Sequence, residues 1–187
     1  MLAALSLAFV LFGCAPEPAQ DPRANMTPLT PESVLQADEG PLEALIETSE
    51  GPFVIRLLSK EAPRHVTHFV KTARKGGYDG TTFHRVVAGK LLEGGDPRAK
   101  DPLEAEASAR ALTRGAVAAG GQFLIALTDR PAGADGRTVF GEVLGGFVVL
   151  DKIARVPVVG EKPQKPVVIQ KITIRKAGIE RTQAPKP

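Results

Sequence analysis

The sequence has few of the residues that form cross-links, metal sites and aromatic surfaces. Of its 187 residues, one is cysteine (Cys14), one is tyrosine, three are histidine and none is tryptophan. A single cysteine excludes an internal disulfide and a metal site built from several thiolates. His65 and His68 stand three residues apart in a predicted helix, but no further ligands accompany them. We therefore expect no bound metal and no cofactor.

The chain also lacks an excess of charge of either sign. It carries 24 Lys and Arg against 21 Asp and Glu, a net charge of +3, and the two signs alternate along the whole sequence. This pattern is typical of a mixed solvated surface and not of the concentrated basic patch that binds nucleic acid. We therefore expect no nucleic-acid partner. The length suits one globular domain with tails, and we expect a monomer.

The first thirteen residues differ from the rest because they contain no charged side chain. The apolar run from 2 to 12 is too short for a membrane-spanning helix, which needs about 20 residues, but it fits the core of a secretory signal peptide. It ends in Leu11-Phe12-Gly13-Cys14, which resembles the lipobox of bacterial lipoproteins. The resemblance implies cleavage before Cys14 and its lipidation. The alternative is an incidental cysteine in a signal peptide that is cut elsewhere.

We accordingly predict a signal peptide over 1–13 and a lipidated, disordered tether over 14–40, which is rich in proline and has no apolar periodicity. Each buried methylene of an acyl chain contributes about 0.8 kcal/mol, so two chains give stable anchoring. We expect an extracytoplasmic protein held on a membrane, the outer membrane if the source is Gram-negative. A globular domain over 41–178 and a flexible tail over 179–187 complete the predicted organisation.

The globular part reads as a series of short strands with two helices. Alternating apolar residues predict a β-hairpin from strands 42–48 and 53–58, and apolar residues at i, i+3, i+4 and i+7 predict a helix over 62–75. The other predicted elements are strands 83–87, 90–93, 122–127, 139–143 and 167–174 and a helix over 147–154. This content predicts a closed or nearly closed antiparallel barrel, although periodicity alone does not separate a barrel from a sandwich.

One segment carries a more specific sequence pattern than the rest of the chain. Residues 78–87 read Tyr-Asp-Gly-Thr-Thr-Phe-His-Arg-Val-Val, and Gly94-Gly95-Asp96-Pro97 follow. This stretch resembles the signature of the cyclophilins, the peptidyl-prolyl cis/trans isomerases, around their catalytic arginine. Further similar blocks stand in family order at 61–63, 122–125, 135–143, 151–153 and 163–174. The resemblance covers roughly 42–177 and implies a mainly β fold, a closed eight-stranded antiparallel β-barrel capped by two α-helices, with a proline-binding groove on its outer face.

The resemblance makes Arg85 the expected catalytic residue. Rotation of an X-Pro bond crosses a barrier of about 18–20 kcal/mol and needs no nucleophile, base or metal, only tighter binding of the twisted amide. A guanidinium suits this task because it is always charged and presents fixed donors. Phe83 is expected in the core. Strand alternation predicts that His84 faces away from Arg85, as a hydrogen-bonded structural histidine.

The resemblance also points to six substrate-binding positions, which are Lys90, Leu91, Glu93, Gly120, Gln122 and Leu124. Several depart from the family pattern, which has aromatic residues at positions 90 and 124 and glutamine at position 93. Glu93 could pair with Arg85 and draw its donors from the substrate, or it could orient Arg85. The sequence leaves both open. The altered pocket is poorer in aromatic residues, so we expect weak binding of cyclosporin-type ligands.

Two functions follow as hypotheses. The first is a peptidyl-prolyl isomerase that assists the folding of extracytoplasmic proteins and takes proline-containing segments of unfolded or envelope proteins as partners. The alternative is a non-catalytic cyclophilin-like module that binds such segments without accelerating rotation. Arg85 favours the first and Lys90 and Leu124 favour the second. A purely structural envelope lipoprotein would account for Cys14 but would leave Arg85 unexplained.

Overall fold

The computed structural model describes residues 40–98, 103–106, 110–119, 123–131 and 136–178. The predicted signal peptide, Cys14, the tether and the tail 179–187 lie outside these ranges. Within them no helix is both long enough and apolar enough to span a membrane. The elements in chain order are β1 (Leu42–Thr48), β2 (Gly51–Leu57), α2 (Pro63–Arg74), β3 (Thr82–Val87), β4 (Leu91–Gly95), β5 (Ala116–Ala118), β6 (Phe123–Ala126), β7 (Val139–Gly145), α3 (Phe147–Ala154), β8 (Val158–Val159), β9 (Lys162–Pro163) and β10 (Val167–Lys176).

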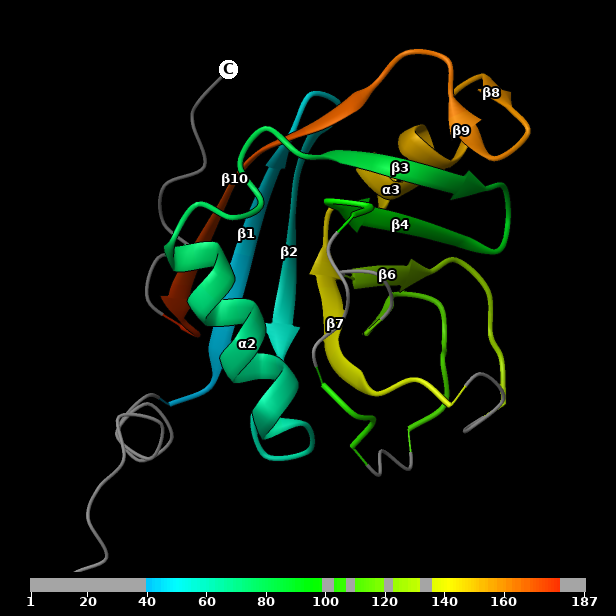
Figure 1. Cartoon of the computed structure of the whole chain (residues 1–187). Helices are drawn as coiled ribbons and strands as arrows, with labels where there is room; N and C mark the ends of the chain where they lie inside the picture. Colours follow the sequence, from blue (N-terminus) through cyan, green and yellow to red (C-terminus); the bar gives the residue numbers. More distant parts are fainter. Residues whose placement is uncertain (1–39, 99–102, 107–109, 120–122, 132–135, 179–187) are drawn as a thin grey trace, which may run out of the picture.

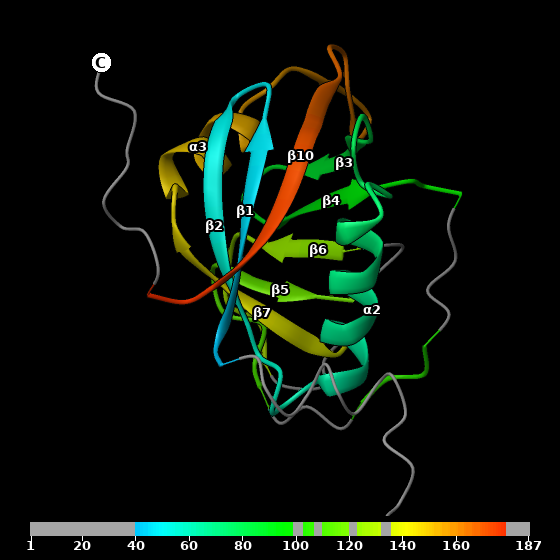
Figure 2. The same ribbon diagram turned by 90° about the vertical axis from the view of Figure 1, so that its left-hand side faces the viewer.

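Eight of these strands close into a barrel in the order β1-β10-β3-β4-β6-β5-β7-β2, and every neighbouring pair is antiparallel. The two helices lie on opposite sides of the barrel (Figures 1 and 2). Strands β8 and β9 form a separate small hairpin beside β3. The predicted closed eight-stranded antiparallel barrel with two helices is therefore confirmed, and closure removes the exposed sheet edges that promote aggregation.

The barrel interior is an apolar core with an aromatic centre. Alternate residues of β1 point inward, and Leu42, Ala44 and Ile46 are at most 6 % exposed. From α2, Phe69 packs against Tyr78 at 5.1 Å and meets Phe123 edge-on at 6.0 Å between ring centroids. Phe83 joins this group as predicted and is 1 % exposed. Such edge-on pairs add to the stabilisation that burial provides.

A second, smaller apolar cluster, which we call the outer cluster, involves the residues of β5, β6 and β7 that alternate with the core residues. It consists of Leu58, Leu112, Ala116, Ala118, Leu124, Ala126 and Val139. Leu112 belongs to the segment that precedes β5, where it bridges to Arg130. That segment covers part of the outer face of the barrel, which bears directly on the site described below.

Three strands escape sequence-based prediction. Strand β5 is Ala-Val-Ala, and alanine has little intrinsic preference for strands, so only its place between β6 and β7 makes it one. Strands β8 and β9 have two residues each, too few for alternation to show. The predicted strand 90–93 is also shifted, since Lys90 lies in the turn between β3 and β4 and its N–H donates to the Val87 carbonyl at 2.9 Å.

The N-terminus of α2 is capped from a distant part of the chain. Its own N-cap residue, Ala62, offers no side-chain acceptor, and the first turn contains no acidic residue. Instead, the Glu106 carboxylate accepts the backbone N–H groups of Arg64 at 3.1 Å and His65 at 3.0 Å, and it lies 2.5 Å from His65 Nδ1. The Glu106 N–H in turn donates to Thr138 Oγ1. Glu106 thus joins the segment before β5 to α2 through its carboxylate and to the approach to β7 through its backbone N–H.

We expect Glu106→Gln to lower the free energy of unfolding by about 1 kcal/mol at neutral pH, the usual cost of a weakened cap. Partial burial acts to raise the pKa of Glu106, but the hydrogen bonds from His65 and the backbone outweigh it and the pKa lies below its usual value. A depressed carboxyl pKa stabilises the fold above the unfolded-state pKa, and this contribution is lost as the pH falls through the folded-state value.

Urea unfolding at neutral and acidic pH tests this prediction. The stability difference between wild type and Glu106→Gln should shrink as the pH is lowered past the ordinary carboxyl range. Glu104→Gln is a matched control, because Glu104 is exposed in the same segment. A difference that stays constant with pH, or a Glu104→Gln variant equally destabilised, would contradict the capping role.

Candidate active site around Arg85

Arg85 lies in the middle of β3, directly opposite Glu93 of β4. The neighbouring side chains Val86 and Leu92 are 2 % and 0 % exposed and belong to the barrel core. Arg85 and Glu93 therefore point to the outer face, where their side chains are 36 % and 12 % exposed. Strands β3 and β4 each pair with a neighbour on both sides in the closed barrel, so the backbones of Arg85 and Glu93 are held on a rigid support.

A β-bulge between Phe83 and Arg85 changes the expected pattern of side chains. Phe83 and Val86 both enter the core, although strict alternation would not allow two residues three apart to share a face. His84 is half-buried and is not part of the core, and its Nδ1 is buried with no hydrogen-bond partner among the described residues. The expectation of simple alternation was therefore wrong here, and the hydrogen bond predicted for His84 is not found at Nδ1.

The guanidinium of Arg85 contacts two carboxylates. Its Nη1 donates to Glu93 Oε1 at 3.1 Å. Its Nε donates to Glu161 Oε2 at 2.5 Å, and its Nη2 lies 3.4 Å from Glu161 Oε1. A guanidinium has five N–H donors, so these contacts leave one N–H on Nη1 and one on Nη2 without a partner among the described residues. Two donors therefore remain for a ligand at the end of the side chain.

These contacts shift the two pKa values in opposite directions. The hydrogen bond to Glu161 raises the pKa of Arg85 above its ordinary value, with smaller contributions from the charge of Glu93. The same hydrogen bond, assisted by the charge of Lys90, lowers the pKa of the Glu161 carboxyl. Both groups are consequently charged throughout the neutral range. A ligand at this site meets a permanent cation flanked by anions.

Sequence reasoning missed two residues of this network. Glu161 lies in the turn of the β8–β9 hairpin, just before the similar block that begins at Pro163. Arg137 lies 3.7 Å from Glu93 Oε1 through its Nη1, which also donates to the Ala119 carbonyl at 3.4 Å. The only signal for Glu161 was Gly160 directly before it, after the apolar pair Val158-Val159, because glycine is typical of a tight hairpin turn. The only signal for Arg137 was its place in the similar block 135–143.

A cavity of about 390 Å³ opens beside the Arg85 guanidinium. Lys90 and Leu91 line it from the end of the β3–β4 hairpin, so the structure brings these two predicted site residues to Arg85. Lys90 is exposed and Leu91 is half-buried. The remaining lining residues are Val87, Thr128, Asp129, Arg130 and Glu161. Six of its eight lining residues have polar or charged side chains, whereas a proline ring prefers contact with apolar side chains.

The other predicted substrate-binding residues are placed differently. Leu124 is on the same face as its strand partner Glu93. It is only 3 % exposed, because it packs among the other residues of the outer cluster. Leu112 and Leu58 belong to the same cluster, so Leu124 offers little surface to a proline ring in this conformation. Gly120 and Gln122 lie outside the described residues. Their roles, like that of Leu124, stay predictions.

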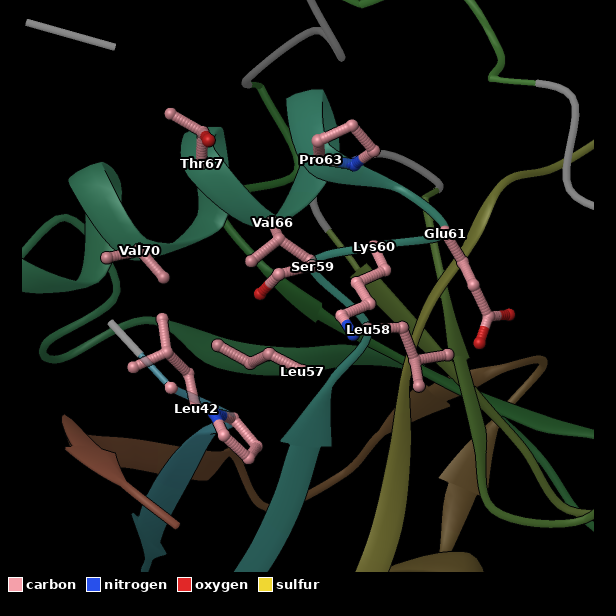
Figure 3. A pocket seen from close by; sticks show the side chains of 12 residues that line it. Leu42, Leu57, Leu58, Ser59, Lys60, Glu61, Pro63, Val66, Thr67 and Val70 are labelled. Carbon is pink, nitrogen blue, oxygen red and sulfur yellow. The ribbon is translucent and has the colours of Figure 1, made fainter. Parts of the chain in front are cut away.

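A larger cavity of about 610 Å³ lies away from this site, between the start of α2, the start of β1 and the end of β2 (Figure 3). Leu57, Val66 and Val70 are among its mostly apolar lining residues. Of the predicted site residues that the structure describes, none borders it. Across the described residues, no group of three or more histidine, cysteine, aspartate or glutamate side chains is arranged to hold a metal ion.

Comparison with known proteins agrees with this geometry. A sequence model of the family described as "Cyclophilin type peptidyl-prolyl cis-trans isomerase/CLD" matches residues 44–174. A peptidyl-prolyl cis-trans isomerase of Helicobacter pylori is 33 % identical over 128 residues, which are 59 % of this chain and 78 % of that protein. The "Peptidyl-prolyl cis-trans isomerase-like 2" of Cryptococcus neoformans is 32 % identical over 164 residues, 75 % of this chain. The chain spans only 29 % of the length of that longer relative.

The fold is also similar to that of a solved structure. The crystal structure of a cyclophilin-type isomerase of Cryptosporidium parvum superimposes with a TM-score of 0.63 at 22 % identity, and covers 73 % of this chain and 98 % of that one. The family match spans nearly the whole barrel, from β1 to β10, and includes the strand that carries Arg85. The chain therefore belongs to the cyclophilin-type peptidyl-prolyl cis-trans isomerase family.

Proposed function

We propose that the barrel domain catalyses the cis/trans isomerisation of peptidyl-prolyl bonds. The observation that carries the proposal is the Arg85 guanidinium, fixed on a central barrel strand beside an open cavity with two N–H donors left for a ligand. Family membership supports the same reaction.

The mechanism follows from what rotation does to the amide. As the X-Pro bond twists, conjugation is lost and the proline nitrogen regains a lone pair, so it becomes a better hydrogen-bond acceptor. A fixed guanidinium N–H that binds this nitrogen stabilises the twisted state more than either planar isomer. A 10⁵-fold acceleration requires about 7 kcal/mol of such differential binding, at 1.36 kcal/mol per decade. The donors on Nη1 and Nη2 of Arg85 are the groups available for it.

A second candidate is a module that binds proline-containing segments without accelerating rotation. Burial of Leu124 under the outer cluster favours it, since the ring-binding wall is covered in this conformation. The exposed Lys90 favours it as well, because an ammonium group is a poor wall for a proline ring, although its alkyl stem offers some apolar surface.

Exchange NMR on an Ala-Pro peptide separates the two functions. A catalyst present at a small fraction of the peptide concentration produces cis/trans exchange cross-peaks, whereas a binding module only shifts peptide resonances in proportion to occupancy. We expect exchange cross-peaks. Shifts that saturate without exchange would assign the binding function. The absence of both exchange and shifts would reject both functions.

We further propose that the protein acts outside the cytoplasm, anchored through a lipid on Cys14, and assists the folding of extracytoplasmic proteins. The apolar run 2–12 and the Leu-Phe-Gly-Cys pattern support this assignment. Expressed in a Gram-negative host with radiolabelled palmitate, the full chain should carry the label and sediment with membranes. Cys14→Ser should abolish both properties. A wild-type chain that remains unlabelled would contradict the anchor and would leave the isomerase proposal untouched.

A further inference from the structure

The backbone of the β8–β9 hairpin holds Glu161 beside Arg85. Gly160, with φ of 65°, and Glu161 form the two-residue turn between β8 and β9, in which Val159 pairs with Lys162. Glycine in the first position of such a turn is favoured because it adopts positive φ without strain. The Glu161 carbonyl accepts the N–H of Val86 at 2.7 Å, so the turn is fastened to the residue that follows Arg85.

The Glu161 side chain engages one particular edge of the guanidinium. Nε and Nη2 lie on the same side of the group, and Glu161 places one carboxylate oxygen on each of them. Glu93 contacts Nη1. Three separate nitrogens are therefore held by two carboxylates from two different elements, and this arrangement defines both the position and the plane of the guanidinium. The free donors on Nη1 and Nη2 then point in a fixed direction.

This contact contributes more to geometry than to stability. The Glu161 side chain is 52 % exposed, and exposed ion pairs contribute little to the stability of a fold. An unrestrained arginine, however, samples many rotamers, and holding it in one before the substrate arrives removes that entropic cost from the reaction. The charge of the nearby Lys90 acts on the same carboxylate and partly offsets the charge of Glu161.

We propose that Glu161 is a positioning residue for the isomerase reaction, which clamps the Nε–Nη2 edge of Arg85 and so directs the remaining donors toward the twisted amide. This inference rests on the isomerase function proposed above. It assigns a role to the β8–β9 hairpin, which otherwise lies outside the closed barrel. Loss of the clamp should reduce an interaction made only in the transition state, so kcat and kcat/KM should fall together while KM stays nearly constant.

The test compares the full-length chain with its Glu161→Gln variant. We expect kcat/KM to fall about fivefold through kcat, since small misplacements of a catalytic group are costly. The matched control is Glu61→Gln, because Glu61 holds Arg110 with the same edge-on geometry on an exposed surface away from the site. Its kinetics should equal those of wild type. In an Arg85→Ala background, Glu161→Gln should have no further effect, because the two residues act as a unit.

A second readout does not depend on activity. The Arg85 Nε–H should give a protected ¹⁵N-coupled resonance in wild type that exchanges rapidly with water in Glu161→Gln. An unchanged or increased kcat/KM in Glu161→Gln would overturn the positioning role, an increase meaning that Glu161 competes with the substrate for Arg85. If wild type proved inactive, the isomerase proposal would fail, and an Nε–H signal that is equal in both proteins would separately reject the clamp.

Discussion

Replacing Arg85 by alanine should reduce kcat/KM for a prolyl peptide by at least about 100-fold, equivalent to about 2.7 kcal/mol of lost transition-state stabilisation. The Arg85 guanidinium is held by Glu93 and Glu161, is always charged and keeps donors that neither carboxylate takes. Arg85→Lys should also lose most activity, because an ammonium keeps the charge but not the planar fork. A protease-coupled assay measures both variants.

The fold should survive these changes. Arg85 is 36 % exposed and its ion pairs lie near the surface, so the free energy of unfolding should change by less than about 1 kcal/mol. Arg110→Ala is the matched control, since Arg110 has a similar exposure and a similar carboxylate partner, and neither Arg110 nor Glu61 lines the cavity beside Arg85. An Arg85→Ala variant that is folded and as active as wild type would remove Arg85 from the mechanism.

Replacing Lys90 by phenylalanine should raise kcat/KM by about tenfold, or roughly 1.4 kcal/mol. Lys90 lines the cavity beside Arg85 together with Leu91, at the position where the family has an aromatic residue. An aromatic ring there would offer the proline ring a flat apolar wall, and the gain comes from the apolar surface that the two rings bury against each other. The affinity for cyclosporin-type ligands, which we expect to be weak in wild type, should increase in parallel, because these ligands are expected to use the same wall.

Lys90→Ala separates the two effects of that substitution, since it removes the charge near Glu161 without adding a ring. We expect Lys90→Ala to stay within about twofold of wild type, because exposed charges contribute little on their own. If Lys90→Phe gave no gain over Lys90→Ala, the limitation would lie elsewhere. The covered Leu124 would then be the next candidate.

Much of the fold could be predicted from local patterns. The hairpin β1–β2, the helix α2 and the helix α3 have clear periodicity, and the predicted bounds of α3 coincide with the observed Phe147–Ala154. Strand β5 could not be predicted, because its alanines form a strand only when β6 and β7 lie on both sides. Lys90 was assigned to a strand because nothing in the local sequence shows that its N–H closes a turn.

The site was predictable only where the family signature extends. Arg85 stands within that signature, Glu93 lies between its two parts, and the two residues are direct partners across β3 and β4. Glu161 is 76 residues from Arg85 in sequence, and its contact depends on how the chain returns after α3. Leu124 was expected in the groove, but the leucine that covers it, Leu112, belongs to a segment without periodicity. Long-range packing of this kind leaves no local pattern.

The most direct test of the account is the isomerisation rate of an Ala-Pro peptide at increasing concentrations of the wild-type domain, residues 41–178, by protease-coupled assay at low temperature. Unaided rotation takes tens to hundreds of seconds, so a catalysed phase is easily separated from it. We predict a first-order rate constant that rises linearly with protein concentration and returns to the uncatalysed value in Arg85→Ala. A rate equal to the uncatalysed one at every concentration of folded wild-type protein would contradict the account.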